Sequence, residues 1–187
     1  VLKKAGIKGA FASHLGAAQE AVSAGMPVWG DFTLNCANRL CADELSGLGI
    51  RDITLSAEVH PRKIAGEMPG DVKIGAVVYG ALPLMLLRNC PLKNSSRYKG
   101  CNRGPCYLND RYGVRFPLLC RDGMVELYNS RPIWLADRLS EFDGLDFHTL
   151  YFTTESEERA KRVIDAYLRG EAPEGEFTRG MYHQKIE

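Results

Sequence analysis

Residues 72–79 read VKIGAVVY, the longest run in the chain of small and β-branched apolar residues. Shorter apolar runs precede it at 9–13, 28–33 and 52–56. Segments with helical spacing of apolar residues separate these runs, at about 15–24 and 37–48. Strands that are apolar on both faces and alternate with helices are typical of a parallel sheet covered on both sides. The sequence therefore predicts an α/β fold in which 72–79 is the longest strand.

The second half of the chain adds a hairpin to this pattern. Segments 114–119 and 124–128 are bounded by turn residues and predict a β-hairpin that turns at Asp122-Gly123. A further strand is expected at 146–152. This element order matches most of a parallel barrel, but a complete (β/α)₈ barrel needs about 250 residues. We therefore expect an incomplete (β/α) TIM-barrel-like parallel sheet, with further strands upstream of Val1.

Two helices are expected in the second half. Ser130 is a suitable N-cap residue, and Pro132 would lie in the first turn of the helix that it caps. Thr154 and Glu157 have the spacing of a capping box ahead of a strongly periodic apolar face. Gly170 is expected to end that second helix.

Length and composition indicate a globular protein with a proper core. The chain has 187 residues, of which 45% are hydrophobic, and a net charge of +1. We expect a partial barrel domain over 1–170, a cysteine-rich insert at about 88–130 and a C-terminal tail at 171–187. No apolar run approaches the eighteen or so residues of a membrane-spanning helix. Six cysteines in a chain that can form a core fit cytoplasmic thiols or a metal site better than disulfides.

Four of the cysteines lie in one glycine-rich, charged stretch with the spacing C-x10-C-x4-C-x13-C, namely Cys90, Cys101, Cys106 and Cys120. Packing does not require thiols in such a stretch, so we interpret all four as metal ligands. A structural zinc usually takes two tight C-x2–4-C pairs, and only Cys101 and Cys106 approximate one. An iron–sulfur cluster accepts wider spacing. Cys41, by contrast, shares a helix face with Leu45 and Leu48 and is expected to be a small buried hydrophobe.

The same stretch is strongly basic. One reading is a solvated basic loop, and another is that the positive charge offsets an anionic thiolate–metal cluster or meets an anionic substrate. From Arg88 to Arg121 the only acidic residue is Asp110, against eight basic residues. These are Arg88, Lys93, Arg97, Lys99, Arg103, Arg111, Arg115 and Arg121.

Polar residues follow several of the expected strands. Asp31 and Asn35 come after the second strand, Glu58 after the third and Arg88 after the fourth. Because the carboxyl ends of parallel strands meet at one edge, we expect these four side chains to line one cleft and to be catalytic. Asn38 is expected either to belong to this group or to cap the helix that follows. The four histidines form no metal-binding pair of the His-x-x-Glu-His kind.

Several short motifs occur in one order over nearly the whole chain, about residues 6–182. They are DFxLN at 31–35, LSxE at 55–58, YGxxPLM at 79–85, RNCP at 88–91, DRxGxxFP at 110–117 followed by Cys120, NS at 129–130 and TRG at 178–180. Together they resemble peptidase family U-32, the collagenase-like peptidases. The resemblance implies a (β/α)-barrel-like core. Relatives in that family hold a four-iron iron–sulfur cluster, 4Fe-4S, on four cysteines, which Cys90, Cys101, Cys106 and Cys120 match by position.

The resemblance implies more than one activity. The family is named for peptidase activity, whereas relatives act in oxygen-independent hydroxylation of ubiquinone precursors and in hydroxylation of ribosomal RNA. We expect an iron–sulfur-dependent redox or hydroxylation-type enzyme or accessory protein, acting on RNA, another anionic substrate or a quinone precursor. Protein hydrolysis and a structural zinc module remain alternatives. Neither a thiol with an orienting histidine nor a serine nucleophile elbow is visible in the sequence.

Overall fold

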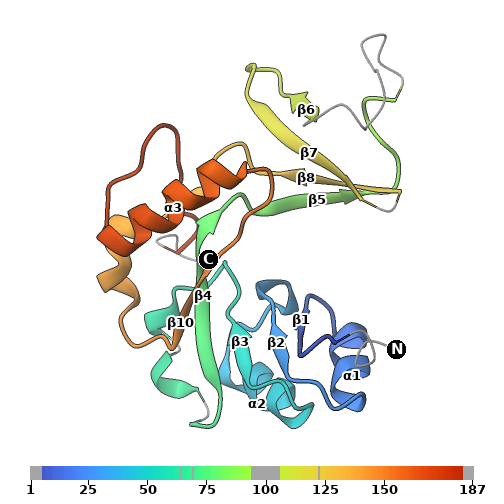
Figure 1. The fold of residues 1–187 in the computed structure, drawn as a ribbon, viewed down its shortest axis with the longest axis vertical. Coiled ribbons are helices and arrows are strands. Elements are labelled where there is room, and N and C mark those ends of the chain that lie inside the picture. The colour runs from blue at the N-terminus through green and yellow to red at the C-terminus, as the bar shows by residue number, and fades with distance from the viewer. Residues whose placement is uncertain (1–5, 64, 69, 94–105, 122, 183–187) are drawn as a thin grey trace. The chain divides into compact units, whose positions relative to one another are not determined.

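The computed structural model describes residues 6–63, 65–68, 70–93, 106–121 and 123–182. These residues form two compact units. The first comprises the described residues up to Val78 together with 137–150 and 179–182, and the second comprises 79–136 and 151–178. Strand β4 (Lys73–Gly80) runs from the first unit into the second. Figure 1 shows both units as a ribbon.

A largely parallel sheet begins in the first unit. Its strands follow the order β1-β2-β3-β4-β10, and β9 pairs antiparallel with the end of β4 at Tyr79 and Gly80. The pairs β1·β2, β2·β3 and β3·β4 are all parallel. The predicted α/β fold with a parallel sheet is therefore confirmed. The strands other than β4 are short: β1 (Ala10–Ala12), β2 (Val28–Gly30), β3 (Asp52–Thr54), β9 (Ile133–Trp134) and β10 (Phe147–Leu150).

One face of the parallel sheet packs against two helices, α1 (Leu15–Ser23) and α2 (Arg39–Gly47). Alternate strand residues and the inner faces of the helices form one buried cluster, which includes Ala12, Val28, Ile53, Ile74, Ala18 and Leu45. Burying each Leu, Ile or Val side chain contributes about 1.5–3 kcal/mol. Side chains cap both helices, because His14 accepts from the Ala17 amide and Asn38 from the Cys41 amide. The predicted capping role of Asn38 is confirmed.

The opposite face of the same strands carries exposed aromatic residues. Phe11 on β1 lies beside Trp29 on β2 in the strand register. Both keep large exposed fractions, 57% and 42% respectively. A side chain at Gly9 would place its Cβ 2.3 Å from the Trp29 ring, so the close approach of this ring explains the glycine. In the part of the chain that the structure describes, the edge strand β1 pairs only with β2.

A four-stranded antiparallel sheet lies in the second unit, with the order β5-β8-β7-β6. The predicted hairpin is confirmed: β7 (Arg115–Arg121) and β8 (Met124–Tyr128) pair through Arg121 and Met124. Gly123 has φ +80° at the turn, while Asp122 lies outside the described residues. Two strands of this sheet were not expected from the sequence, β5 (Pro83–Leu87) and β6 (Cys106–Asn109).

The prediction of a helix after Ser130 is wrong. Ile133 and Trp134 form strand β9, and a 3₁₀ segment, Ala136–Phe142, follows with a kink at Arg138. Ile133 and Trp134 are both almost fully buried, and they pair with the end of β4. Burial of both faces and the ladder hydrogen bonds outweigh the local helix signals of Ser130 and Pro132.

The last helix, α3 (Glu157–Arg169), forms where the sequence predicts a helix, but its cap differs. Ser156 is the N-cap and accepts from the Arg159 amide, so Thr154 does not cap the helix. Gly170 ends the helix in the left-handed conformation with φ +66°, as predicted. Glu157 and Glu158 in the first turn and Arg169 in the last turn complement the helix dipole.

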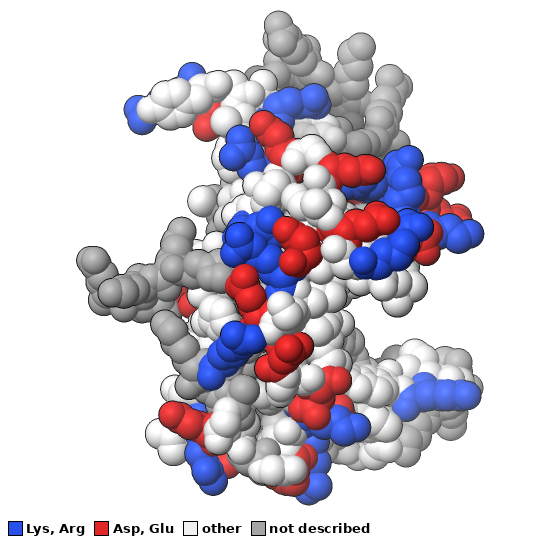
Figure 2. All heavy atoms as spheres, turned by 90° about the vertical axis from the view of Figure 1, so that its left-hand side faces the viewer, with Lys and Arg blue, Asp and Glu red and all other residues white. Residues whose placement is uncertain are grey.

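The surface shows no field of a single sign on the side drawn in Figure 2, where acidic and basic side chains are interspersed. This distribution agrees with the net charge of +1. Among the described residues, the longest helix has 13 residues, and none is long and apolar enough to cross a membrane.

Candidate functional site

The loop that follows β2 is built on Asp31. Its carboxylate is buried, with a residue exposure of 4%, and accepts from the Phe32 amide at 2.8 Å and the Thr33 hydroxyl at 3.1 Å. Burial raises the pKa of this carboxyl above its ordinary value, while the two hydrogen bonds act in the opposite direction. Asp31 thereby starts the 3₁₀ turn Phe32–Leu34. Its first role is to anchor the loop at the carboxyl end of the sheet.

Asn35 ends this turn in an unusual conformation. Its φ of +54° lies in the left-handed region, and it is the only described residue other than glycine with a positive φ. Asparagine tolerates this region better than most residues, and such residues concentrate at turns and functional sites. The carbonyl of the next residue, Cys36, accepts from the Ser56 amide at 2.9 Å. This bond ties the loop after β2 to the loop after β3.

Glu58 lies in that second loop with an exposed side chain. Its amide donates to the Ser56 hydroxyl at 3.4 Å. Because β2 and β3 are parallel neighbours, the structure brings Asp31, Asn35 and Glu58 to one edge of the sheet. Arg88 belongs to the second unit, where it follows β5 and is exposed. That Asp31, Asn35, Glu58 and Arg88 line one cleft stays a prediction.

Two of the four clustered cysteines lie on neighbouring strands. Cys106 begins β6 directly opposite Leu118 on β7, and Cys120 lies two residues further along β7. Side chains two residues apart on a strand share a face, so Cys106 and Cys120 lie on the same face of the sheet. Diagonal neighbours of this kind are about 7–8 Å apart between Cα atoms. The separation is within reach of one metal cluster.

Cys90 approaches the same end of this sheet from β5. Leu87, the last residue of β5, pairs with Val125 on β8, and Val125 pairs with Cys120 on β7. Cys90 follows Leu87 by three residues, beyond the end of the strand. In Figure 1 the end of β5 and the tip of the β7–β8 hairpin reach the same side of the sheet. Cys90 and Cys120 therefore lie toward the same end of the four-stranded sheet, whereas Cys106 lies on β6, at the opposite edge of the sheet from β5. Cys101 lies outside the described residues.

The described cysteines do not by themselves form a complete metal site. No group of three His, Cys, Asp or Glu side chains placed to hold a metal exists among the described residues. Four thiolates are the donor set of an iron–sulfur cluster, and one of the four predicted donors is Cys101. The described geometry supports no reaction step through a cluster.

Cys36 and Cys41 lie apart from the clustered set, in the first unit. Cys36 is fully buried, and Cys41 is half-buried and packs against the same core, as its helical spacing predicts. Burial raises the pKa of the Cys36 thiol to about 12, and the neighbouring Cys41 adds to this effect. Because the thiolate is the nucleophilic form, Cys36 is not a suitable nucleophile at neutral pH.

Sequence reasoning missed a carboxylate that is held by several donors, Glu155. Its Oε1 accepts from the Tyr79 hydroxyl at 3.0 Å, and its Oε2 accepts from the amides of Thr153 at 2.7 Å and Thr154 at 3.0 Å. Burial raises the pKa of Tyr79, and the negative charge of Glu155 adds to the shift. Glu155 lies directly before Ser156, the N-cap of α3. Identification of Ser156 as the N-cap is the only sequence signal that could have pointed to Glu155.

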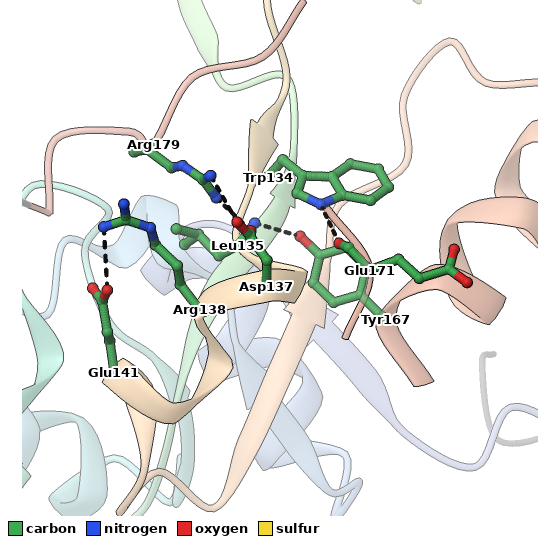
Figure 3. Close-up of polar contacts among 8 residues, drawn as sticks. All are labelled: Trp134, Leu135, Asp137, Arg138, Glu141, Tyr167, Glu171 and Arg179. Carbon is green, nitrogen blue, oxygen red and sulfur yellow. Dashed lines mark hydrogen bonds and ion pairs between the residues drawn. The ribbon is translucent and has the colours of Figure 1, made fainter. Parts of the chain in front are cut away.

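An aromatic cluster surrounds Tyr79 in the second unit. The rings of Trp134, Phe152 and Tyr167 lie 5.3–6.1 Å from the Tyr79 ring, between centroids. Figure 3 shows how polar bonds fix two of these rings. The Tyr167 hydroxyl accepts from the Leu135 amide at 2.8 Å, and the Trp134 indole donates to the Glu171 carbonyl at 3.1 Å. The cluster therefore joins β4, β9 and α3.

Arg179, the arginine of the TRG motif, makes a bidentate ion pair in the first unit. Its guanidinium donates to both carboxylate oxygens of Asp137 at 2.5 and 2.8 Å, as Figure 3 shows. The hydrogen bonds from Arg179 hold the pKa of the Asp137 carboxyl below its ordinary value. Three residues later, Tyr182 is buried and donates to the Val77 carbonyl at 2.6 Å. Residues 179–182 of the expected tail thus belong to the first unit, whereas 171–178 belong to the second.

No protein-family model, no curated protein and no solved structure matches this sequence. The resemblance to peptidase family U-32 therefore stays a prediction.

Proposed function

We propose that this chain is a U-32-type, iron–sulfur-dependent redox enzyme or accessory protein of the hydroxylation type, with Cys90, Cys101, Cys106 and Cys120 as ligands. The observation that supports the proposal is the position of Cys106 and Cys120 as diagonal neighbours on one face of the β6–β7 pair, with Cys90 beyond the end of β5 in the same sheet. These three cysteines come from different segments of the chain. A four-iron cluster, when bound, supplies one-electron transfer. The substrate classes are RNA and a quinone precursor.

The chain's own polar residues have distinct roles in this proposal. Arg88 is exposed two residues before Cys90, so its charge offsets the negative charge of a thiolate cluster. Asp31 holds the loop after β2, and Asn35 gives that loop its left-handed bend. Glu58 presents an exposed carboxylate at the same edge of the parallel sheet and is the proposed proton acceptor.

The parallel sheet is proposed to be part of a (β/α) barrel in a cytoplasmic protein. The exposed pair Phe11 and Trp29 supports this, because aromatic residues on an edge strand and on its neighbour are normally covered by another element. Strands upstream of Val1 are the proposed cover. A cytoplasmic location agrees with several cysteines that serve as thiols or metal ligands.

Metal analysis of protein purified without oxygen tests the proposal. We expect iron and acid-labile sulfide in about equal amounts, with visible absorbance that Cys90→Ala abolishes. Cys41→Ala is the matched control, because Cys41 packs beside the core of the first unit and should leave both signals unchanged. Zinc with no sulfide would instead favour the structural zinc module. Peptide hydrolysis that survives in folded Cys90→Ala would favour the peptidase.

A further inference from the structure

The second unit contains an open groove of about 520 Å³ beside the turn that joins β6 and β7. Tyrosines and arginines make up much of its lining, and one acidic residue contributes. The lining includes Tyr107, Tyr112, Arg115, Arg131 and Glu176. A groove of this size is within the range of ligand sites, which is roughly 300–1,000 Å³.

The turn at one side of the groove holds Tyr112 out toward solvent. The Asp110 carboxylate accepts from the Tyr112 amide at 2.8 Å and from the Val114 amide at 2.9 Å. Gly113 supplies the positive φ of +81° that the turn requires. Tyr112 is nevertheless 75% exposed. A large aromatic side chain on a firmly bonded turn is prepared to bind a ligand, because little backbone entropy is lost on binding.

Arginines accompany both tyrosines. The Arg115 guanidinium lies 4.1 Å from the centroid of the Tyr107 ring, and the Arg111 guanidinium lies 4.7 Å from that of Tyr112. Tyr107 and Arg115 share one face of the β6–β7 pair, as the register shows. The residues that the structure describes form no ion pair with Arg111 or Arg115, whereas Arg131 pairs with Glu176 at 3.3 Å. Two guanidinium groups therefore remain available to an anionic ligand.

We propose that this groove binds single-stranded nucleic acid, with a base stacked on the exposed Tyr112 ring and phosphates paired with Arg111 and Arg115, the latter held against Tyr107. Stacking on aromatic side chains combined with a basic groove is the usual recognition mode for unpaired strands. A duplex does not offer its base faces for stacking, and an acidic peptide would not use the tyrosine rings in this way.

The groove is an anchoring surface and not the place of reaction. Tyr107 and Arg115 lie on the opposite face of the β6–β7 pair from Cys106 and Cys120, because neighbouring residues on a strand alternate between faces. This inference deepens the proposed function, because it selects RNA over the quinone precursor as the substrate class. The reaction itself rests on the proposed function. Binding itself does not require the cluster.

Fluorescence anisotropy with a labelled oligonucleotide of about 12 nucleotides, a length within the usual site sizes, tests the proposal. RNA and DNA strands of the same sequence are compared with a DNA duplex. We expect either single strand to bind more tightly than the duplex. Tyr112→Ala should weaken binding about tenfold or more, because stacking is lost, and Tyr112→Phe should stay within about twofold.

Charge variants separate specific contacts from general attraction. Arg115→Gln should weaken binding and reduce the slope of log K against log salt by about 0.7, as expected for one lost phosphate contact to a single strand. Lys161→Gln on the exposed side of α3 removes the same charge away from the groove and should leave the affinity unchanged. Circular dichroism of each variant confirms that it is folded.

Several results would overturn the inference. They are the absence of binding to both single strands, equal binding of the duplex, and wild-type affinity in Tyr112→Ala. Cys90→Ala distinguishes this inference from the proposed function, because it should lose the cluster absorbance and keep oligonucleotide binding. Iron without binding removes only the groove proposal, and binding without iron removes only the iron–sulfur proposal.

Discussion

Replacing Tyr167 by Phe removes one oxygen atom from the centre of the second unit. The Tyr167 ring is 8% exposed, and its hydroxyl accepts from the amide of the fully buried Leu135 at 2.8 Å. Phe keeps the ring packing against Tyr79 and Trp134 but leaves this amide without an acceptor. An unsatisfied buried donor costs about 1–3 kcal/mol. For a chain of this length that corresponds to a fall in Tm of roughly 2–12 °C.

Urea unfolding followed by tryptophan fluorescence measures this loss, because Trp134 lies 5.4 Å from the Tyr167 ring. The midpoint should fall while the denaturant slope stays constant. Tyr112→Phe removes the same oxygen from a residue that is 75% exposed, and should change the free energy of unfolding by less than about 0.5 kcal/mol. Equal effects of the two substitutions would refute the reasoning, since burial of the Leu135 amide would then have no consequence.

Three further predictions follow from single contacts. Gly75→Ala should destabilise the protein by about 1–3 kcal/mol in urea unfolding, because the new Cβ would lie 2.3 Å from the Phe147 ring. The double variant Gly75→Ala/Phe147→Ala should lose less stability than the sum of the losses in the two single variants. Additive losses would exclude the clash. Arg179 lowers the folded-state pKa of Asp137, so the ion pair stabilises the protein above the unfolded-state pKa near 3.8, and this stabilisation is lost as the pH falls through the folded-state pKa. Asp137→Asn should flatten this part of the curve of unfolding free energy against pH. An unchanged curve would contradict the assignment. Cys36 has a thiol pKa raised to about 12, so iodoacetamide at pH 8 should modify it in urea but not in the native protein, as peptide mass spectrometry would show; rapid native labelling would mean that its burial is wrong.

The parallel part of the fold was predictable because its signals are local. Strands β1 to β4 each coincide with an apolar run of the sequence, and Asn38 and, in the second unit, Gly170 mark helix ends by well-defined backbone bonding. The hairpin was predictable for the same reason, since turn residues lie between two β-prone segments.

The missed strands depend on partners far away in the sequence. Ile133 and Trp134 form β9 because they pair with the end of β4, more than fifty residues earlier. Strand β5 begins at Pro83 and has no alternation of apolar and polar residues, so only its pairing with β8 reveals it. Propensity reasoning cannot detect either contact, because the stabilisation comes from tertiary pairing.

The candidate site was predictable to a similar extent. Sequence position alone brought Asp31, Asn35 and Glu58 to one sheet edge, because the carboxyl ends of parallel strands coincide. The binding of Glu155 by Tyr79 was not predictable, because it requires the end of β4 and the loop after β10 to be placed together. The shared end of Cys90 and Cys120 likewise follows from the unexpected strand β5.

The iron content of single-cysteine variants prepared without oxygen tests the central claim most directly. The account predicts about four iron atoms per wild-type chain and a large loss in each of the four variants Cys90→Ala, Cys101→Ala, Cys106→Ala and Cys120→Ala. Cys36→Ala and Cys41→Ala should retain the iron, provided that circular dichroism shows them folded. Wild-type iron content in any folded variant of the first four, or an iron-free wild-type protein, would contradict the account.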